Sequence, residues 1–140
     1  MSEQLESRTR EVTEENRELI RTAYETFGRG DIPAILGMLD PKVEWTDAEG
    51  FPTAGTYVGP DAVKSMFAHI GSDWDRFAAV PSAYVADRDH VVVLGEYSVT
   101  HKATSKSATV PFAHVWRIKD GKIIRFRQFT DGPPFQRVVK

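Results

Sequence analysis

The chain has 140 residues, a formal net charge of −2 and no cysteine. This length indicates a single domain that can bury a hydrophobic core. The small net charge gives no electrostatic case for nucleic-acid binding, and the lack of cysteine excludes disulfides and thiolate metal sites.

Residues 1–12 are polar and charged, and they contain no apolar run that could form a signal peptide or a membrane span. They are expected to be a flexible extension, either frayed or a solvated continuation of the first helix, of one domain at residues 13–140. The protein is expected in the cytoplasm. Thr13 is a candidate N-cap of the first helix, whose apolar residues recur on one face up to Gly28.

A second helix, a strand and a third helix are expected next. Asp31 can cap the short second helix. Residues 43–47 alternate between apolar and polar side chains and predict a strand, in which Trp45 and Asp47 share one face. Pro60 fits the first position of the third helix.

The second half of the chain predicts antiparallel strands. Residues 79–86 and 91–101 have strand character, and Tyr97 belongs to the apolar face of the second run. Residues 108–131 predict a hairpin, because Asp120 and Gly121 favour a two-residue turn. Helices followed by strands are typical of an α+β fold with helices on one face of a curved sheet.

The tight turn fixes which hairpin residues share a face. In a continuous register, the face that resembles the wall of a core or pocket carries Ala113, Val115, Ile124, Phe126 and Gln128. The opposite face interleaves aromatic and cationic residues, as interfaces do, and carries Phe112, His114, Trp116, Arg125, Arg127 and Phe129. We therefore expect a homodimer through the second face and a neutral, structural His114. A β-bulge would reverse this geometry.

Four stretches resemble landmarks of the nuclear transport factor 2-like (NTF2-like) superfamily, in its SnoaL-like, ketosteroid isomerase-related branch. They are YETFGRGD at 24–31, LDPKVEWTD at 39–47, GTYVGPDAV at 55–63 and the hairpin at 112–131. The resemblance implies a cone, in which a curved, mixed and mostly antiparallel sheet wraps around N-terminal helices and leaves a concave apolar pocket. It also implies homodimers that pack sheet against sheet. It does not fix the function, because the superfamily includes isomerases, cyclases, dehydratases, epoxide hydrolases and binding proteins.

The resemblance places Asp47 where ketosteroid isomerases keep their general-base aspartate. The tyrosine and the protonated aspartate of their oxyanion hole would fall on Ala23 and Ala113, which cannot donate a hydrogen bond. A carboxylate of limonene epoxide hydrolases would fall on Gln128. Ketosteroid isomerisation is therefore not expected.

Asp47 is the candidate catalytic residue. A carboxyl beside Trp45 on a core-facing strand loses solvation, which raises its pKa and suits a general base. The alternative is that Asp47 caps the following loop. Candidate substrate-binding residues combine apolar surface with a few polar tips: Tyr24, Trp45, Phe67, Tyr97, Phe126 and Gln128. The alternative for each is simple core packing, or for Gln128 a structural hydrogen bond.

Three functions stay open from the sequence. The first is an acid–base enzyme of the isomerase, cyclase or dehydratase type, acting on a small hydrophobic carbonyl compound. The second is a non-catalytic pocket for a small hydrophobic molecule, and the third is a dimerisation module. No metal or other cofactor is expected, because His69, His90 and His101 lack metal-ligand spacing. Nucleic acid and membrane are not expected as partners.

Overall fold

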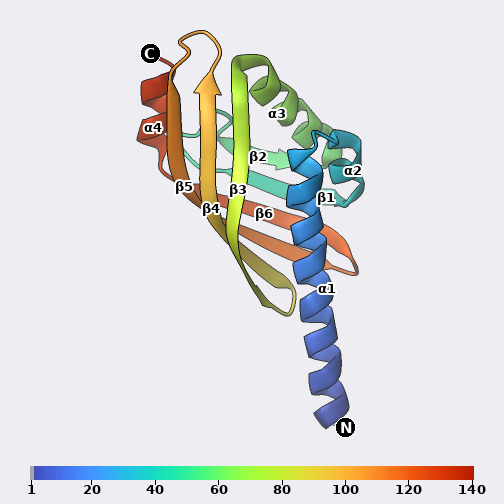
Figure 1. Cartoon of the computed structure of the whole chain (residues 1–140). Coiled ribbons are helices and arrows are strands. Elements are labelled where there is room, and N and C mark those ends of the chain that lie inside the picture. The colour runs from blue at the N-terminus through green and yellow to red at the C-terminus, as the bar shows by residue number, and fades with distance from the viewer. Residues whose placement is uncertain (1) are drawn as a thin grey trace.

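A computed structural model describes residues 2–140 (Figure 1). Its helices are α1 (Ser2–Gly28), α2 (Ile32–Gly37), α3 (Pro60–Asp73) and α4 (Gly132–Val138). Its strands are β1 (Leu39–Asp47), β2 (Gly55–Val58), β3 (Trp74–Asp87), β4 (His90–His101), β5 (Ser107–Lys119) and β6 (Lys122–Thr130). Within residues 2–140, no helix combines the length and the hydrophobicity needed to span a bilayer.

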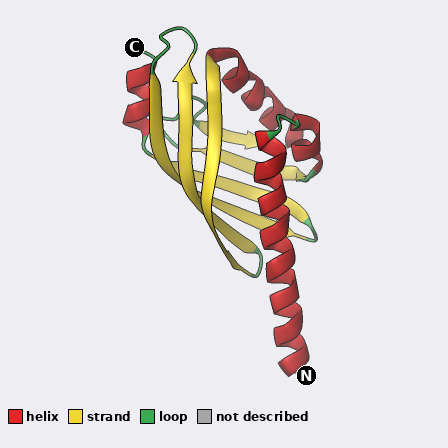
Figure 2. Ribbon diagram, viewed as in Figure 1, coloured by secondary structure: helices red, strands yellow, loops and turns green. Residues whose placement is uncertain are grey.

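The strands form one six-stranded sheet in the order β2-β1-β6-β5-β4-β3. β1 and β6 run parallel, and the other neighbouring strands run antiparallel. The sheet is strongly curved, and α1 and α3 pack against its strands (Figure 2). This arrangement confirms the expected α+β cone.

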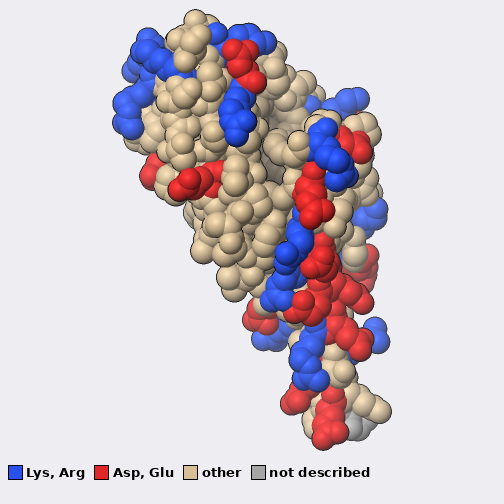
Figure 3. Space-filling model, viewed as in Figure 1, with Lys and Arg blue, Asp and Glu red and all other residues tan. Residues whose placement is uncertain are grey.

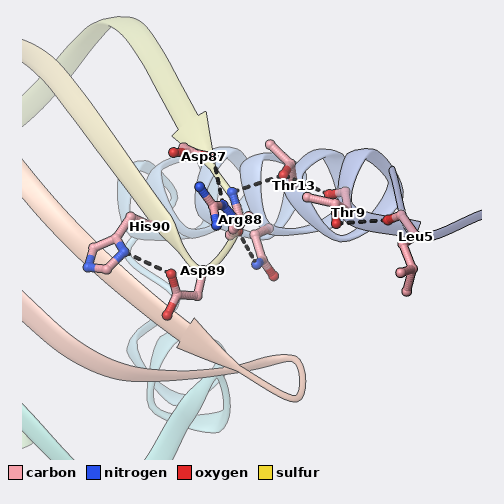
Figure 4. A network of polar contacts seen from close by, with 8 residues as sticks. Leu5, Thr9, Thr13, Asp87, Arg88, Asp89 and His90 are labelled. Carbon is pink, nitrogen blue, oxygen red and sulfur yellow. Dashed lines mark hydrogen bonds and ion pairs between the residues drawn. The ribbon is translucent and has the colours of Figure 1, made fainter. Parts of the chain in front are cut away.

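The first helix begins at Ser2, so the predicted N-cap at Thr13 was wrong. Thr13 lies inside α1, where its hydroxyl donates to the Thr9 carbonyl and accepts from the Arg88 backbone N–H at 2.9 Å. Asn16 Nδ2 donates to the Arg88 carbonyl at 2.8 Å. These bonds join the middle of α1 to the β3–β4 turn (Figure 4), and the helix projects beyond that turn (Figure 1).

Tertiary pairing extends two strands beyond their predicted bounds. β1 begins at Leu39, which pairs with Ile123 and precedes the predicted strand at 43–47. β3 begins at Trp74, before the predicted strand at 79–86. The helix α4 was not predicted, although prolines are compatible with a first helical turn, and its Phe135 is buried in the core.

The β5–β6 hairpin contains a β-bulge at Ile124, and the continuous register was therefore wrong. The pairs next to the turn are as predicted, with Lys119 facing Lys122. The register then shifts between Arg117 and Ile118, because β6 contributes one extra residue.

The shift decides which aromatic residues are buried. Trp116 pairs with Phe126 and His114 pairs with Gln128, so all four side chains share the concave face and are buried. The predicted interface face does not exist as such, because Phe112, His114 and Trp116 belong to the core. Arg125, Arg127 and Phe129 stay exposed on the convex face.

Candidate functional site: an aromatic pocket with a buried carboxyl

A cavity of about 70 Å³ lies between the concave face and the helices. Its lining includes each candidate site residue from the sequence: Tyr24, Trp45, Asp47, Phe67, Tyr97, Phe126 and Gln128. It also includes Phe51, Phe77, His114 and Trp116, which sequence reasoning did not place there. Aromatic surface with a few polar groups is the usual character of a small-molecule pocket.

The walls are built from aromatic rings in contact with one another. The Trp45 ring stacks on Phe126 at 4.0 Å between centroids and meets the edge of Phe67 at 5.5 Å. Behind the wall, the ring of Phe112, which does not itself line the cavity, stacks on His114 at 3.9 Å between centroids. Such contacts fix the positions of the rings and exclude water from the space between them.

The sheet register brings the polar groups of the cavity into one row. Thr46 of β1 pairs with Arg127 of β6, so Asp47 and Gln128 occupy the next positions along these two parallel strands. Gln128 in turn pairs with His114 of β5. A carboxyl, an amide and an imidazole therefore lie side by side on the concave face.

Asp47 is only 4% exposed. Trp45 Nε1 donates to its Oδ1 at 3.1 Å, and Thr53 Oγ1 donates to its Oδ2 at 2.8 Å. Burial raises the pKa of Asp47 from 3.8 to about 6, although the hydrogen bonds from Thr53 and Trp45 oppose the shift. The carboxyl thus ties down the following loop through Thr53 and also titrates near neutral pH.

His114 lies between two tyrosines. Its Nδ1 is 2.5 Å from the Tyr24 hydroxyl and its Nε2 is 2.6 Å from the Tyr97 hydroxyl. Trp116 Nε1 donates to the Tyr24 hydroxyl at 3.0 Å, and Gln128 Nε2 donates to the Tyr97 hydroxyl at 2.6 Å. We call Tyr24, His114 and Tyr97 the Tyr–His–Tyr relay.

The relay is uncharged at neutral pH. Burial lowers the pKa of His114 to about 3 and raises the pKa of both Tyr24 and Tyr97 above the ordinary tyrosine value. Gln128 fixes the Tyr97 end of the relay. Its Nε2 donates to the Tyr97 hydroxyl, and its Oε1 accepts from the Ala48 backbone N–H at 2.9 Å. The structural hydrogen bonds that were the alternative for Gln128 are therefore present.

Ala23 and Ala113, which match the oxyanion-hole positions of ketosteroid isomerases, lie in different parts of the structure. Ala23 lines the cavity, as expected for the position of the isomerase tyrosine. Ala113 pairs with Leu94 and Phe129 on the convex side and does not line the cavity. His114, the next residue, faces the cavity instead, because the bulge reverses the faces of β5 relative to the predicted register.

A signal for His114 was present in the sequence. Ile123 and Ile124 are adjacent apolar residues in a strand that otherwise alternates, and such a break is where a bulge is accommodated.

Among residues 2–140, no group of three His, Cys, Asp or Glu side chains is close enough to hold a metal ion.

Comparison with known proteins identifies relatives over most of the chain. The SnoaL-like domain family matches residues 20–126. An NTF2-like protein of Burkholderia thailandensis is 34% identical, and its structure matches 89% of this chain and 97% of that chain with a TM-score of 0.86. TerC, whose crystal structure was determined with polyporic acid, is 30% identical over 89% of this chain and 98% of that chain, with a TM-score of 0.81.

One curated relative is similar over a shorter stretch. Patulin synthesis protein F of Aspergillus clavatus is 29% identical over 83 residues, which are 57% of this chain and 42% of that protein. The similarity therefore spans less than half of that relative.

Proposed function

The chain belongs to the SnoaL-like domain family, and from this premise we propose that it is an acid–base enzyme acting on a small hydrophobic carbonyl compound, with Asp47 as the base. The family consists of NTF2-like proteins with small-molecule pockets. The observation that carries the proposal is the buried Asp47 carboxyl in an aromatic cavity, with no cation paired to it among the described residues.

The chemistry follows from the pKa of this carboxyl. With a pKa of about 6, Asp47 is mostly ionised at pH 7, yet basic enough to accept a proton from a carbon acid and to return it as an acid. The hydrogen bonds from Trp45 and Thr53 fix the carboxyl group, and each of its oxygens keeps a lone pair. The substrate-binding surface in this proposal comprises Tyr24, Trp45, Phe67, Tyr97, Phe126 and Gln128.

The ligand class rests on the walls of the cavity and on one relative. Aromatic rings favour a flat apolar ligand, and the neutral polar groups favour an oxygen substituent over an ion. TerC, whose crystal structure was determined with polyporic acid, supports a small organic molecule as the ligand. Among residues 2–140, Asp47 is the only carboxyl that lines the cavity, so ketosteroid isomerisation is not part of the proposal.

We expect the protein to accelerate deuterium exchange at the carbon beside the carbonyl of 2-tetralone. This compound is a small aromatic ketone with acidic C–H bonds, and a positioned base typically accelerates proton transfer by about 100-fold or more. Loss of the C1 proton signal in D₂O, followed by NMR against buffer alone, measures the effect.

A second function is favoured by the small cavity and by the hydrogen bonds that Asp47 already accepts. These observations suit a pocket that binds a hydrophobic molecule without turnover. Binding of 2-tetralone with exchange at the buffer rate would support this function and contradict catalysis. If 2-tetralone neither binds nor exchanges, the proposed ligand class is wrong.

The homodimer is also a proposal, now through Phe129 and three other residues of the convex face. Val80, Val85, Leu94 and Phe129 are 44–58% exposed, although they are large and apolar. Charged side chains gather along α1 in Figure 3, whereas the surface over the neighbouring strands carries few. An exposed apolar sheet face of this kind is a typical contact surface between protein chains.

We expect light scattering at micromolar concentration to give twice the chain mass, and Leu94→Glu to shift the protein toward the monomer. The charge would face the partner without disturbing the core, because Leu94 is 44% exposed. Ser65→Glu is a control for an added negative charge, because Ser65 is exposed on α3, away from the convex face. A wild-type protein that stays monomeric at high concentration would contradict the dimer.

A further inference from the structure

The Tyr–His–Tyr relay contains one more hydroxyl proton than its internal hydrogen bonds can use. A neutral imidazole donates from one ring nitrogen and accepts at the other. Both nitrogens of His114 contact a tyrosine hydroxyl, and the ring is 3% exposed. The side chains packed around the ring include Phe112, Trp116 and Phe126. Among the described residues, no carboxylate is hydrogen-bonded to the ring that would hold it charged.

In one tautomer the proton is on Nδ1. His114 then donates to the Tyr24 oxygen and accepts the Tyr97 proton at Nε2. The Tyr24 oxygen also accepts from Trp116 Nε1, so its two lone pairs are occupied. The Tyr24 proton has no acceptor within the relay.

In the other tautomer the proton is on Nε2. His114 then donates to the Tyr97 oxygen, which also accepts from Gln128 Nε2. The Tyr24 proton is used on Nδ1, and the Tyr97 proton has no acceptor within the relay. Among the described residues, neither hydroxyl makes a further hydrogen bond.

We propose that the relay is a hydrogen-bond donor site for an oxygen of the ligand, and that the tautomer of His114 selects whether Tyr24 or Tyr97 donates. Both tyrosines line the cavity that holds Asp47. The ligand oxygen is the carbonyl oxygen of the proposed function, and in this respect the inference rests on that function.

The donor has a defined part in the proposed proton transfer. The C–H bond beside the carbonyl breaks, its proton forms an O–H bond on Asp47, and its electron pair forms the C=C bond of an enolate. The C=O electron pair moves onto oxygen, where the free tyrosine proton stabilises the new charge by a hydrogen bond. Return of the proton from Asp47 to carbon reverses every change.

Two matched variants, Tyr24→Phe and Tyr97→Phe, test without any ligand how the protons are shared within the Tyr–His–Tyr relay. In Tyr24→Phe, Nδ1 of His114 loses its hydrogen-bond partner. A buried N–H without an acceptor is rarer in proteins than a buried acceptor without a donor, so Nδ1 is expected to be the unprotonated nitrogen. We therefore expect the Nε2–H tautomer in Tyr24→Phe and the Nδ1–H tautomer in Tyr97→Phe. Histidine ¹⁵N shifts and their couplings to ring protons distinguish the two.

The ligand readout uses 2-tetralone and its hydrocarbon analogue tetralin. Each single variant keeps one free hydroxyl, whereas Tyr24→Phe/Tyr97→Phe has none. We expect the double variant to bind 2-tetralone roughly 3- to 10-fold more weakly, which is the size of one neutral hydrogen bond, and to bind tetralin as the wild type does. Equal loss for both compounds would contradict a donor site.

The same tautomer in both single variants, or unchanged 2-tetralone binding in the double variant, would overturn the inference. The wild type gives a test that does not depend on the folding of any variant. If its histidine ¹⁵N shifts show His114 protonated on both ring nitrogens at pH 6, the inference is overturned as well. The tautomers are measured without ligand and without Asp47 chemistry. Failed exchange of 2-tetralone would therefore contradict the proposed function and leave the donor site standing.

Discussion

Asp47→Asn is expected to abolish the exchange of 2-tetralone and, at pH 8, to make the protein more stable. The folded protein holds the pKa of Asp47 at about 6, whereas the ordinary value is 3.8. The folded protein holds the proton on Asp47 more tightly than the unfolded chain does. The resulting contribution to the free energy of unfolding is therefore fully present below pH 3.8 and is lost as the pH rises through 6. A shift of this size corresponds to roughly 3 kcal/mol in the free energy of unfolding.

Asparagine keeps the shape of the side chain and carries no charge to desolvate. Its carbonyl oxygen can accept from Trp45 Nε1, and the Thr53 hydroxyl can turn to accept from its amide. The variant should thus resemble the wild type in stability at pH 4 and exceed it at pH 8. Ligand binding should persist, because the walls of the cavity do not change.

Urea unfolding at pH 4, 6 and 8 measures this difference. Asp120→Asn is the control, because it removes the same charge from an exposed turn in which φ is 50°, a conformation that asparagine accepts. Parallel stability profiles for the wild type and Asp47→Asn across this range would contradict a raised pKa at Asp47.

Gly95→Ala is expected to cost about 3 kcal/mol of stability or more, the upper range for overpacked sites. A Cβ atom at Gly95 would lie 2.3 Å from the Val80 carbonyl oxygen, 2.6 Å from Phe112 Cζ and 2.9 Å from Pro81 Cα. Two of these atoms belong to the backbone of β3 and cannot turn aside as a flexible side chain would. The third belongs to the ring that stacks on His114.

The consequence extends to the site, because a displaced Phe112 no longer holds the His114 ring. Urea unfolding and the near-ultraviolet circular dichroism of the aromatic residues measure both effects. Gly71→Ala is the matched control, since Gly71 lies in α3 and no atom of the described residues outside its own helical turn stands within 4 Å of an added Cβ. It should raise stability by about 0.5–1 kcal/mol. Equal stability of the two variants would show that β3 moves away from the added Cβ atom at Gly95 without loss of stability, which would contradict the prediction.

Local patterns predicted most of the fold. Alternation identified the concave face of β4, where Val91, Val93, Tyr97 and Val99 are buried. It also put Asp47 and Trp45 on the same face of β1. These features follow from the period of a strand, which the sequence carries directly.

The pocket was less predictable, because its polar row depends on strand register. One extra residue at Ile124 decides whether His114 faces solvent or the cavity, and the sequence contains only the adjacent isoleucines as a sign of it. The extent of α1 was missed for a similar reason. Thr13 has the chemistry of an N-cap, but its hydroxyl is used by the backbone of Arg88, which is distant in sequence.

In the proposed function, Asp47 is a base whose pKa lies near neutral pH inside an aromatic pocket. NMR titration of the Asp47 carboxyl carbon tests it most directly, with Asp47→Asn identifying the signal. We predict a midpoint at about pH 6. A midpoint at or below about 3.9, the value of an unperturbed aspartate, would contradict it and make Asp47 a loop-anchoring residue in a binding pocket.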